Sequence, residues 1–254
     1  MCFDDDARPP IPIQAGTGAT GEDIRLESTD GAKPMAYKAE PGVPATSQVV
    51  ILPDVRGLHH FYRELADRFA ETGHRALAID YFARSAPNDD RSDAFEYMPH
   101  VQAMTPESFG LDLRAAVSKL RGEGQSLPTY TVGFCYGGSL SFWSGTQGLD
   151  LAGVIGFYAG FRAAGARKSP LDYAHEIQCP VLGLFGGADE SIPQDVIDEF
   201  KNKLDAAGVT NEIVVYPGAP HSFFDRRATD YAQESADAWM RIQGFMAGKQ
   251  PVAV

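Results

Sequence analysis

Short, unbroken apolar runs alternate with amphipathic segments along most of the chain. Residues 49–52 and 76–79 are continuously apolar, as in strands buried on both faces of a sheet. Between them, residues 60–71 carry apolar side chains three and four apart, which predicts a helix ending near Gly73. The same alternation predicts strands at residues 129–134, 151–158, 181–185 and 212–216, and helices at residues 106–121, 138–147, 195–207 and 231–246.

The N-terminal region follows a different pattern. Residues 22–28 and 35–39 flank an Asp30-Gly31 turn signal, which predicts an antiparallel hairpin at a sheet edge. Residues 1–21 are rich in Pro, Gly and Thr and offer little to bury, so we expect a flexible arm there. Residues 22–254 contain no interdomain linker and no internal repeat, and we expect them to form a single domain.

The order of the predicted elements indicates a fold class. Strands that alternate with helices favour parallel pairing through right-handed crossovers, with helices on both faces of the sheet. The pattern therefore predicts an α/β protein with a mostly parallel sheet and an N-terminal antiparallel hairpin. Two polar, irregular segments interrupt the alternation, at residues 84–105 and 160–177. Because each follows a strand, and open α/β sheets bind ligands at the carboxyl ends of their strands, these segments are candidate pocket walls.

Composition and charge narrow the function classes. Apolar residues make up 44% of the chain and charged residues 22%, which is ordinary for a globular protein. A net charge of −12 without a basic run argues against nucleic acid or an anionic membrane as a partner. The acidic N-terminal residues are unlike a signal peptide, so we expect a cytoplasmic protein. The three cysteines, an odd number without Cys-x-x-Cys spacing, fit a reducing compartment.

The clearest chemical signal is a Gly-x-Cys-x-Gly motif at residues 133–137, between a predicted strand and a predicted helix. Such a turn is so tight that larger side chains two residues before or after the nucleophile would clash, which explains Gly133 and Gly137. Cys135 would stand clear of the sheet at a helix N-terminus, whose dipole favours a thiolate. A lone cysteine is more often a small core residue, but the strand and helix around this one favour a nucleophile.

A thiol nucleophile needs a base, and the base needs an acid to orient it. In folds with this elbow the acid and then the histidine follow the nucleophile along the chain. Asp189 follows a predicted strand and a Gly186-Gly187 turn, and His221 follows the next strand and a Pro-Gly turn. Because parallel strands end at one edge of the sheet, we expect Cys135, Asp189 and His221 to meet there as a catalytic triad.

These motifs resemble the dienelactone hydrolase family, which has the α/β-hydrolase fold. The resemblance rests on the cysteine elbow, on Gly-Gly-x-Asp-x-x-x-Pro at residues 186–193 and on Gly-Ala-x-His-Ser-Phe at residues 218–223, and it covers most of the chain. It implies an oxyanion hole formed by the backbone N–H groups of Val55 and Tyr136. It also implies that Asp54, directly after a strand, contacts the resting thiol.

Members of this family that are specialised for dienelactone bind a substrate carboxylate with arginines. Where they carry an arginine four residues beyond the histidine, this chain has Asp225, which argues against dienelactone as the substrate but not against ester hydrolysis. Candidates for substrate contact, from the resemblance and from their places near the two irregular segments and the histidine, are Arg84, Arg91, Arg226, Tyr81 and Tyr97.

Together the residues predict a cofactor-independent hydrolase of small esters or lactones that acts through a covalent acyl-enzyme on Cys135. Two alternatives stay open: a thiol hydrolase for another electrophile, such as a phosphotriester, and a non-catalytic redox-sensing protein on the same fold. We expect no metal or nucleotide site, because no motif has the required spacing. The expected partner is a small-molecule substrate, and the protein is expected to be a monomer or a homodimer.

Overall fold

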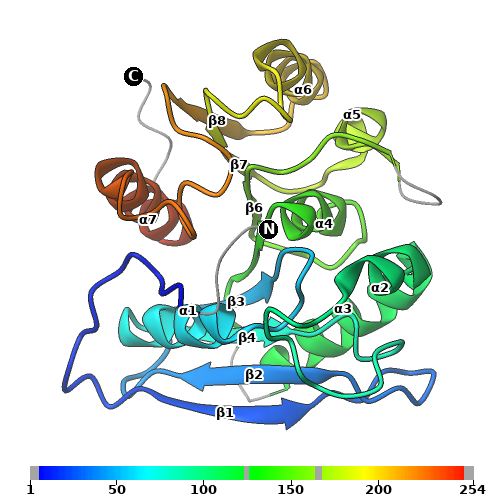
Figure 1. Ribbon diagram of the computed structural model, residues 1–254, viewed down its shortest axis with the longest axis vertical. Coiled ribbons are helices and arrows are strands. Elements are labelled where there is room, and N and C mark those ends of the chain that lie inside the picture. Colours follow the sequence, from blue (N-terminus) through cyan, green and yellow to red (C-terminus); the bar gives the residue numbers. More distant parts are fainter. Residues whose placement is uncertain (1–5, 123–125, 164–167, 249–254) are drawn as a thin grey trace.

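An eight-stranded sheet forms the centre of the protein (Figure 1). The computed structural model describes residues 6–122, 126–163 and 168–248. The strand order is β1-β2-β4-β3-β5-β6-β7-β8, with β2 antiparallel to both of its neighbours and all other pairs parallel. The strands are β1 (Thr20–Arg25), β2 (Met35–Glu40), β3 (Ser47–Leu52), β4 (His74–Ile79), β5 (Thr129–Phe134), β6 (Gly153–Phe157), β7 (Val181–Gly186) and β8 (Asn211–Tyr216). The predicted mostly parallel sheet with an N-terminal hairpin is confirmed.

The unbroken apolar runs form the middle of this sheet. Every residue of β3, β5, β6 and β7 is buried, because helices cover both faces there. The edge strands differ: β1 is mostly exposed, and β8 is half-buried over most of its length. The polar character of β1 leaves little apolar surface on that exposed edge for another chain to pair with.

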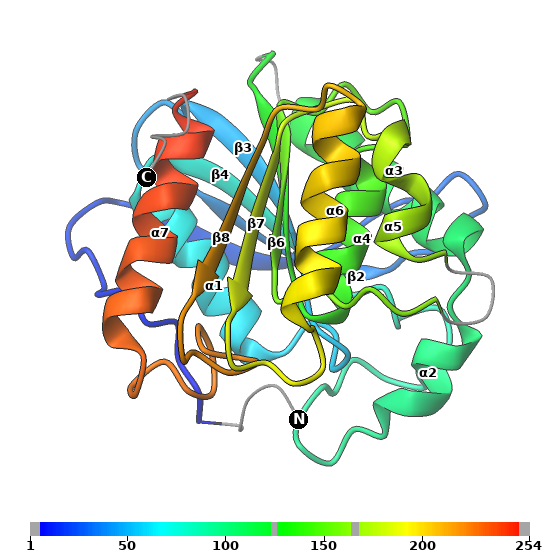
Figure 2. The ribbon, with the colours of Figure 1, turned by 90° about the horizontal axis from the view of Figure 1, so that it is seen from above.

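Helices cover both faces, as predicted. Figure 2 shows α1 and α7 on one side of the sheet and α3, α4 and α6 on the other. The helices are α1 (His60–Glu71), α2 (Tyr97–Ala103), α3 (Pro106–Arg121), α4 (Tyr136–Ser144), α5 (Pro170–Tyr173), α6 (Gln194–Ala206) and α7 (Ala232–Met246), with a 3₁₀ turn η1 (Ala174–Glu176). The sequence patterns predicted both bounds of α3 and the start of α1 to the residue, and α1 ends two residues before the expected Gly73.

The capping residues explain why α3 begins where it does. Thr105 accepts a hydrogen bond from the backbone N–H of Ser108 and the Ser108 hydroxyl completes the capping box, with Pro106 at the first helical position. The elbow helix α4 begins two residues earlier than the predicted Gly138, because the chain turns at the single residue Cys135 and becomes helical at once.

The two irregular segments contain short helices that the sequence pattern did not predict. In the first segment, α2 has no buried residue, so no apolar face marks it in the sequence. In the second, α5 and η1 are only four and three residues long, too short for helical periodicity to show. Residues 164–167 of the second segment lie outside the described residues.

The segment before β1 lies against helix α1. Residues 6–19 contain no helix or strand, and residues 1–5 of the expected arm lie outside the described part. Ile11 is only 8% exposed and packs in the main core. Arg8 pairs with Glu64 of α1 at 3.0 Å, and the backbone N–H of Gln14 donates to Glu71 at 2.9 Å. β1 begins at Thr20, two residues before the expected hairpin.

Candidate active site

Cys135 occupies a sharp turn between β5 and α4. Its φ of 53° and ψ of −111° are a strained backbone conformation for a residue with a side chain. A Cβ atom at Gly133 would lie 1.9 Å from the carbonyl oxygen of Gly137, and one at Gly137 would lie 2.1 Å from that of Leu52. Only glycine fits at either position. The Cys135 residue is half-buried, and the turn places it at the N-terminus of α4.

The loops that carry Asp189 and His221 are tied to each other. The N–H of Ala188 donates to the carbonyl of Ala219 at 2.9 Å, and the N–H of Gly187 donates to that of Tyr216 at 2.8 Å. A Cβ atom at Gly186 would come within 2.4 Å of the same Ala219 oxygen, so glycine permits this close approach. Two segments about thirty residues apart are thereby held side by side at the carboxyl edge of the sheet.

Asp189 and His221 form a hydrogen-bonded pair. The Nδ1 atom of His221 lies 2.6 Å from Oδ2 of Asp189. The other carboxylate oxygen of Asp189, Oδ1, accepts hydrogen bonds from the backbone N–H and the hydroxyl of Ser191, at 2.9 and 2.6 Å. Burial opposes ionisation of Asp189, but the bonds from His221 and Ser191 outweigh it and lower the pKa of this carboxyl. A buried carboxylate therefore faces one nitrogen of a partly exposed imidazole, as orientation of a catalytic base requires.

The loop after β3 lies beside the elbow and is held from several sides. Asp54 is fully buried, and its Oδ1 accepts the N–H of Arg56 at 2.9 Å. The Tyr81 hydroxyl donates to the carbonyl of Asp54 at 2.6 Å and to that of Pro53. Burial raises the pKa of Tyr81 well above its usual value, and negative charge on Asp54 or Cys135 raises it further. Tyr81 thus supports the loop that carries Val55.

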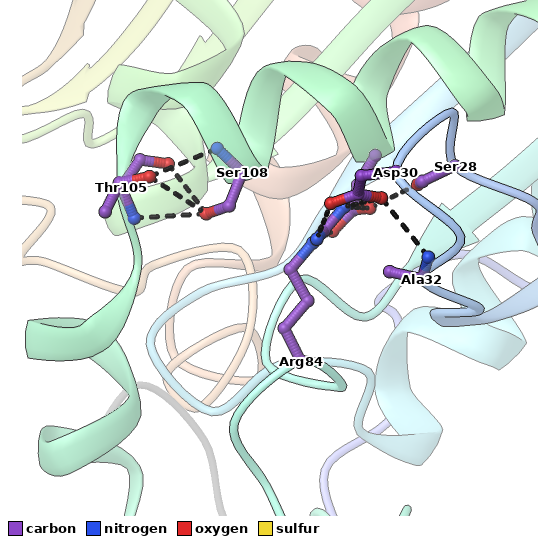
Figure 3. Close-up of polar contacts among 7 residues, drawn as sticks. Ser28, Asp30, Ala32, Arg84, Thr105 and Ser108 are labelled. Atoms are coloured by element: carbon purple, nitrogen blue, oxygen red, sulfur yellow. Dashed lines mark hydrogen bonds and ion pairs between the residues drawn. The ribbon is translucent and has the colours of Figure 1, made fainter.

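The candidate arginines of the first irregular segment are engaged in ion pairs. Arg84 donates to Asp112 at 2.7 and 2.8 Å and to Asp30 at 2.5 and 3.2 Å. Figure 3 shows its guanidinium directed at the carboxylate of Asp30. Arg91 pairs with Asp80 at 2.7 Å, and both side chains are 1% exposed. These contacts join the segment to the rest of the domain.

The other two candidates for substrate contact lie apart from these ion pairs. Tyr97, the first residue of α2, is half-buried and packs against the smaller of the two core clusters. Arg226 is exposed on the segment after His221.

Asp225 and Tyr158 are two residues near the histidine whose contacts the sequence did not indicate. Asp225 is buried, and the Tyr158 hydroxyl donates to its Oδ2 at 2.6 Å. The Tyr158 ring lies 4.8 Å from the His221 ring, centroid to centroid. Burial raises the pKa of Asp225 to about 8, the Tyr158 hydrogen bond lowers it in part, and the charge of Asp54 raises it. The only indication in the sequence that this position is unusual was that Asp225 stands where dienelactone-specialised members of the resembled family carry an arginine.

A cavity of about 570 Å³ lies along α4. Its lining comes from α2, the start of α3, one side of α4 and the η1 region, so both irregular segments contribute to it. Tyr136, the residue after Cys135, is at one end, and its hydroxyl donates to the sulfur of Met104 at 3.9 Å. Within the described ranges, no group of three or more His, Cys, Asp or Glu residues could hold a metal ion, and no helix could cross a membrane.

Sequence comparisons with known proteins agree on one family. The sequence profile of the dienelactone hydrolase family matches residues 35–249. A protein of Methylorubrum extorquens named "Putative carboxymethylenebutenolidase" is 31% identical over 237 residues, which is 90% of this chain and 81% of that protein.

Solved structures show the same fold. The crystal structure of a "Putative Dienelactone Hydrolase" from Klebsiella pneumoniae matches with a TM-score of 0.80 and 26% identity, covering 90% of this chain and 98% of the other. A dienelactone hydrolase-like promiscuous phosphotriesterase from metagenomic libraries matches with a TM-score of 0.75 and 21% identity, covering 92% and 100%.

Proposed function

This chain belongs to the dienelactone hydrolase family and is a hydrolase, and we propose that it cleaves small esters or lactones through a covalent acyl-enzyme on Cys135. The observation that carries the proposal is the Asp189–His221 hydrogen bond of 2.6 Å at the edge of the sheet where the strained Cys135 turn is formed. A buried carboxylate on Nδ1 keeps the proton on that nitrogen, so Nε2 is the atom that exchanges protons in the reaction.

In the proposed first step, the Cys135 sulfur attacks the ester carbonyl carbon after His221 takes the thiol proton. The carbonyl oxygen becomes an oxyanion, held by the backbone N–H groups of Val55 and Tyr136, each contributing about 3 kcal/mol. Tyr136 is the first residue of α4, so its backbone N–H lies at the positive end of the helix dipole, which favours a nearby oxyanion. His221 then gives the proton to the departing alkoxide, and a thioester remains.

In the second step, His221 takes a proton from water, and the resulting hydroxide attacks the thioester carbonyl. The same two N–H groups hold the second oxyanion. When the carbon–sulfur bond breaks, the acid leaves and the proton returns to the sulfur, so the enzyme is restored without a cofactor. Asp189, already ionised because of its lowered pKa, stabilises the imidazolium formed in each step.

The test compares Cys135→Ala with the matched variant Cys179→Ala. Cys179 is buried, and burial raises the pKa of its thiol to about 12, so it is not a thiolate near neutral pH. On p-nitrophenyl acetate, Cys135→Ala should lose at least about 10³-fold in kcat/KM, while Cys179→Ala keeps the wild-type value. Mass spectrometry of the quenched wild-type reaction should find the acyl group on the Cys135 peptide.

Three results would separate this proposal from its alternatives. Substantial esterase activity in Cys135→Ala would overturn the mechanism. Turnover of a phosphotriester but not of any ester or lactone would favour the other electrophile. Alkylation of Cys135 without turnover of any of these substrates would favour a redox-sensing protein.

A further inference from the structure

The cavity along α4 has the position and the chemistry of a second part of the substrate site. We propose that this α4 groove binds an apolar, uncharged substituent of the ester, so that the preferred substrates are neutral esters with an extended apolar acyl chain. The inference rests on the proposed function, because the groove is assigned to the substrate of Cys135.

The groove runs along the helix that begins at the elbow. Tyr136 is adjacent to Cys135 in the chain, and Leu140 and Trp143 come four and seven residues later on the same side of α4. At 1.5 Å per residue, this side of the helix runs for about 10 Å from Tyr136 to Trp143. Thr146 and Gln147 mark the far end of the lining. The proposal places a substituent of a carbonyl bound at Cys135 along this side of α4.

The lining of the groove suits an apolar ligand. Apart from α4, it is formed by Met98 and Val101 of α2, by Met104 directly after α2 and by Phe109 of α3. A volume of about 570 Å³ lies within the roughly 300–1,000 Å³ of ordinary small-molecule sites. Burying hydrocarbon against such a surface is favourable by about 0.8 kcal/mol per CH₂, which is about fourfold in a binding constant.

The charges around the groove disfavour an anionic ligand. Among the described residues, its lining contains two acids, Glu107 and Glu176, against one base, Lys168, and no arginine. Arg84 and Arg91 are held by carboxylates elsewhere and do not reach it. A carboxylate placed in the groove would lose water without gaining the bidentate partner that arginine provides, which costs more than burying an uncharged end.

The experiment measures kcat/KM for p-nitrophenyl esters from acetate to decanoate. In the wild-type protein, kcat/KM should rise by up to about fourfold per CH₂ over the first members of the series and then level off. The pentanoate ester should exceed the carboxylate-bearing succinate ester, of similar length, by at least about tenfold. A flat chain-length series, or a succinate ester that equals the pentanoate ester, would overturn the proposal.

Two tryptophan substitutions in α2 locate the effect. Val101→Trp fills the groove from a half-buried position, and α2 has no fully buried residue that the change would displace. It should lower the ratio of octanoate to acetate kcat/KM at least about tenfold. Ala103→Trp, on the same helix but exposed and outside the groove, should keep the wild-type ratio. Equal ratios in the two variants would overturn the assignment.

A binding measurement tests the groove independently of catalysis by Cys135. The chain has two tryptophans, so Trp239→Phe leaves Trp143, which lines the groove, as the single tryptophan. In this background with Cys135→Ala, titration with 2-decanone should give a saturable change in Trp143 emission although no hydrolysis is possible. No saturable change would overturn the groove assignment, whatever the esterase assays show. Acetate turnover that does not depend on Cys135 would instead overturn the proposed function and leave the groove result standing.

Discussion

Replacing Asp225 by asparagine tests how one buried acid shapes the pH dependence of stability. Asp225 is 4% exposed, and burial raises its carboxyl pKa to about 8, with the charge of Asp54 adding to the rise. The hydrogen bond from Tyr158 opposes this rise without cancelling it. At neutral pH the side chain is therefore mostly a neutral acid. Asparagine has a similar shape, stays neutral at every pH and removes this titration from the protein.

The sign of the effect follows from where the proton is bound. The ordinary pKa of an aspartate carboxyl is 3.8, and that of Asp225 in the folded protein is about 8, so between these values folding retains a proton that the unfolded chain has released. Rising pH then favours unfolding. The contribution of the protonated Asp225 carboxyl to the free energy of unfolding is complete below about pH 4. It falls by about 1.4 kcal/mol per pH unit above that and is lost near pH 8. Over the whole window this is on the order of 6 kcal/mol, comparable with the total stability of many domains.

The assay is the thermal unfolding midpoint of wild type and Asp225→Asn at pH values from 5 to 7.5. The stability of the variant relative to wild type should increase with pH by about 1.4 kcal/mol per unit, or roughly 3–5 °C in Tm for a chain of this size. Asparagine offers one oxygen acceptor in place of two, which costs about 1 kcal/mol but equally at every pH. As a control, Asp198→Asn at an exposed position should show the same dependence of Tm on pH as the wild-type protein. A pH-independent gap between Asp225→Asn and wild type would refute the reasoning.

Two further substitutions test the surroundings of the elbow. Arg91→Ala leaves Asp80 buried without its ion-pair partner, so the free energy of unfolding measured in urea should fall by about 3–5 kcal/mol. The ratio of kcat/KM for the succinate and pentanoate esters should stay at the wild-type value. A selective loss of kcat/KM on the succinate ester would instead identify Arg91 as a ligand of the substrate carboxylate. Asp54→Asn removes a buried negative charge near Cys135, which would otherwise disfavour the thiolate. Iodoacetamide should therefore label the Cys135 thiol faster at pH 7, while ester hydrolysis does not become faster. An unchanged labelling rate would contradict the idea that Asp54 disfavours ionisation of Cys135.

Much of the fold was predictable because its determinants are local. The bounds of α1 and α3 follow from apolar spacing and from caps within a few residues of each helix end. The elbow was predictable for a similar reason, because a turn with φ of 53° at its centre needs glycine two residues away on each side. The residues that define it are therefore five consecutive positions of the chain, 133–137. The pairing of Asp189 with His221 was also expected, since both follow parallel strands that end at one edge.

The features that could not be predicted involve residues far apart in the chain. Arg84 and Arg91 were candidates for substrate contact, and only the folded chain brings Asp112 and Asp80 to them and occupies their charges. Helix α2 buries no residue, so no periodic pattern could predict it, although its residues form a wall of the α4 groove.

Asp225 shows the physical reason most directly. From the sequence it is an ordinary acid beside two arginines, and its neutral state at pH 7 arises from burial beside Tyr158 and near Asp54, residues 67 and 171 positions away. Hydrophobic periodicity and backbone strain depend on neighbouring residues, so the order of the elements and the position of the elbow cysteine could be predicted from the sequence. Burial and charge pairing depend on which distant segments pack together, so the charged groups that remain exposed could be identified only from the folded chain.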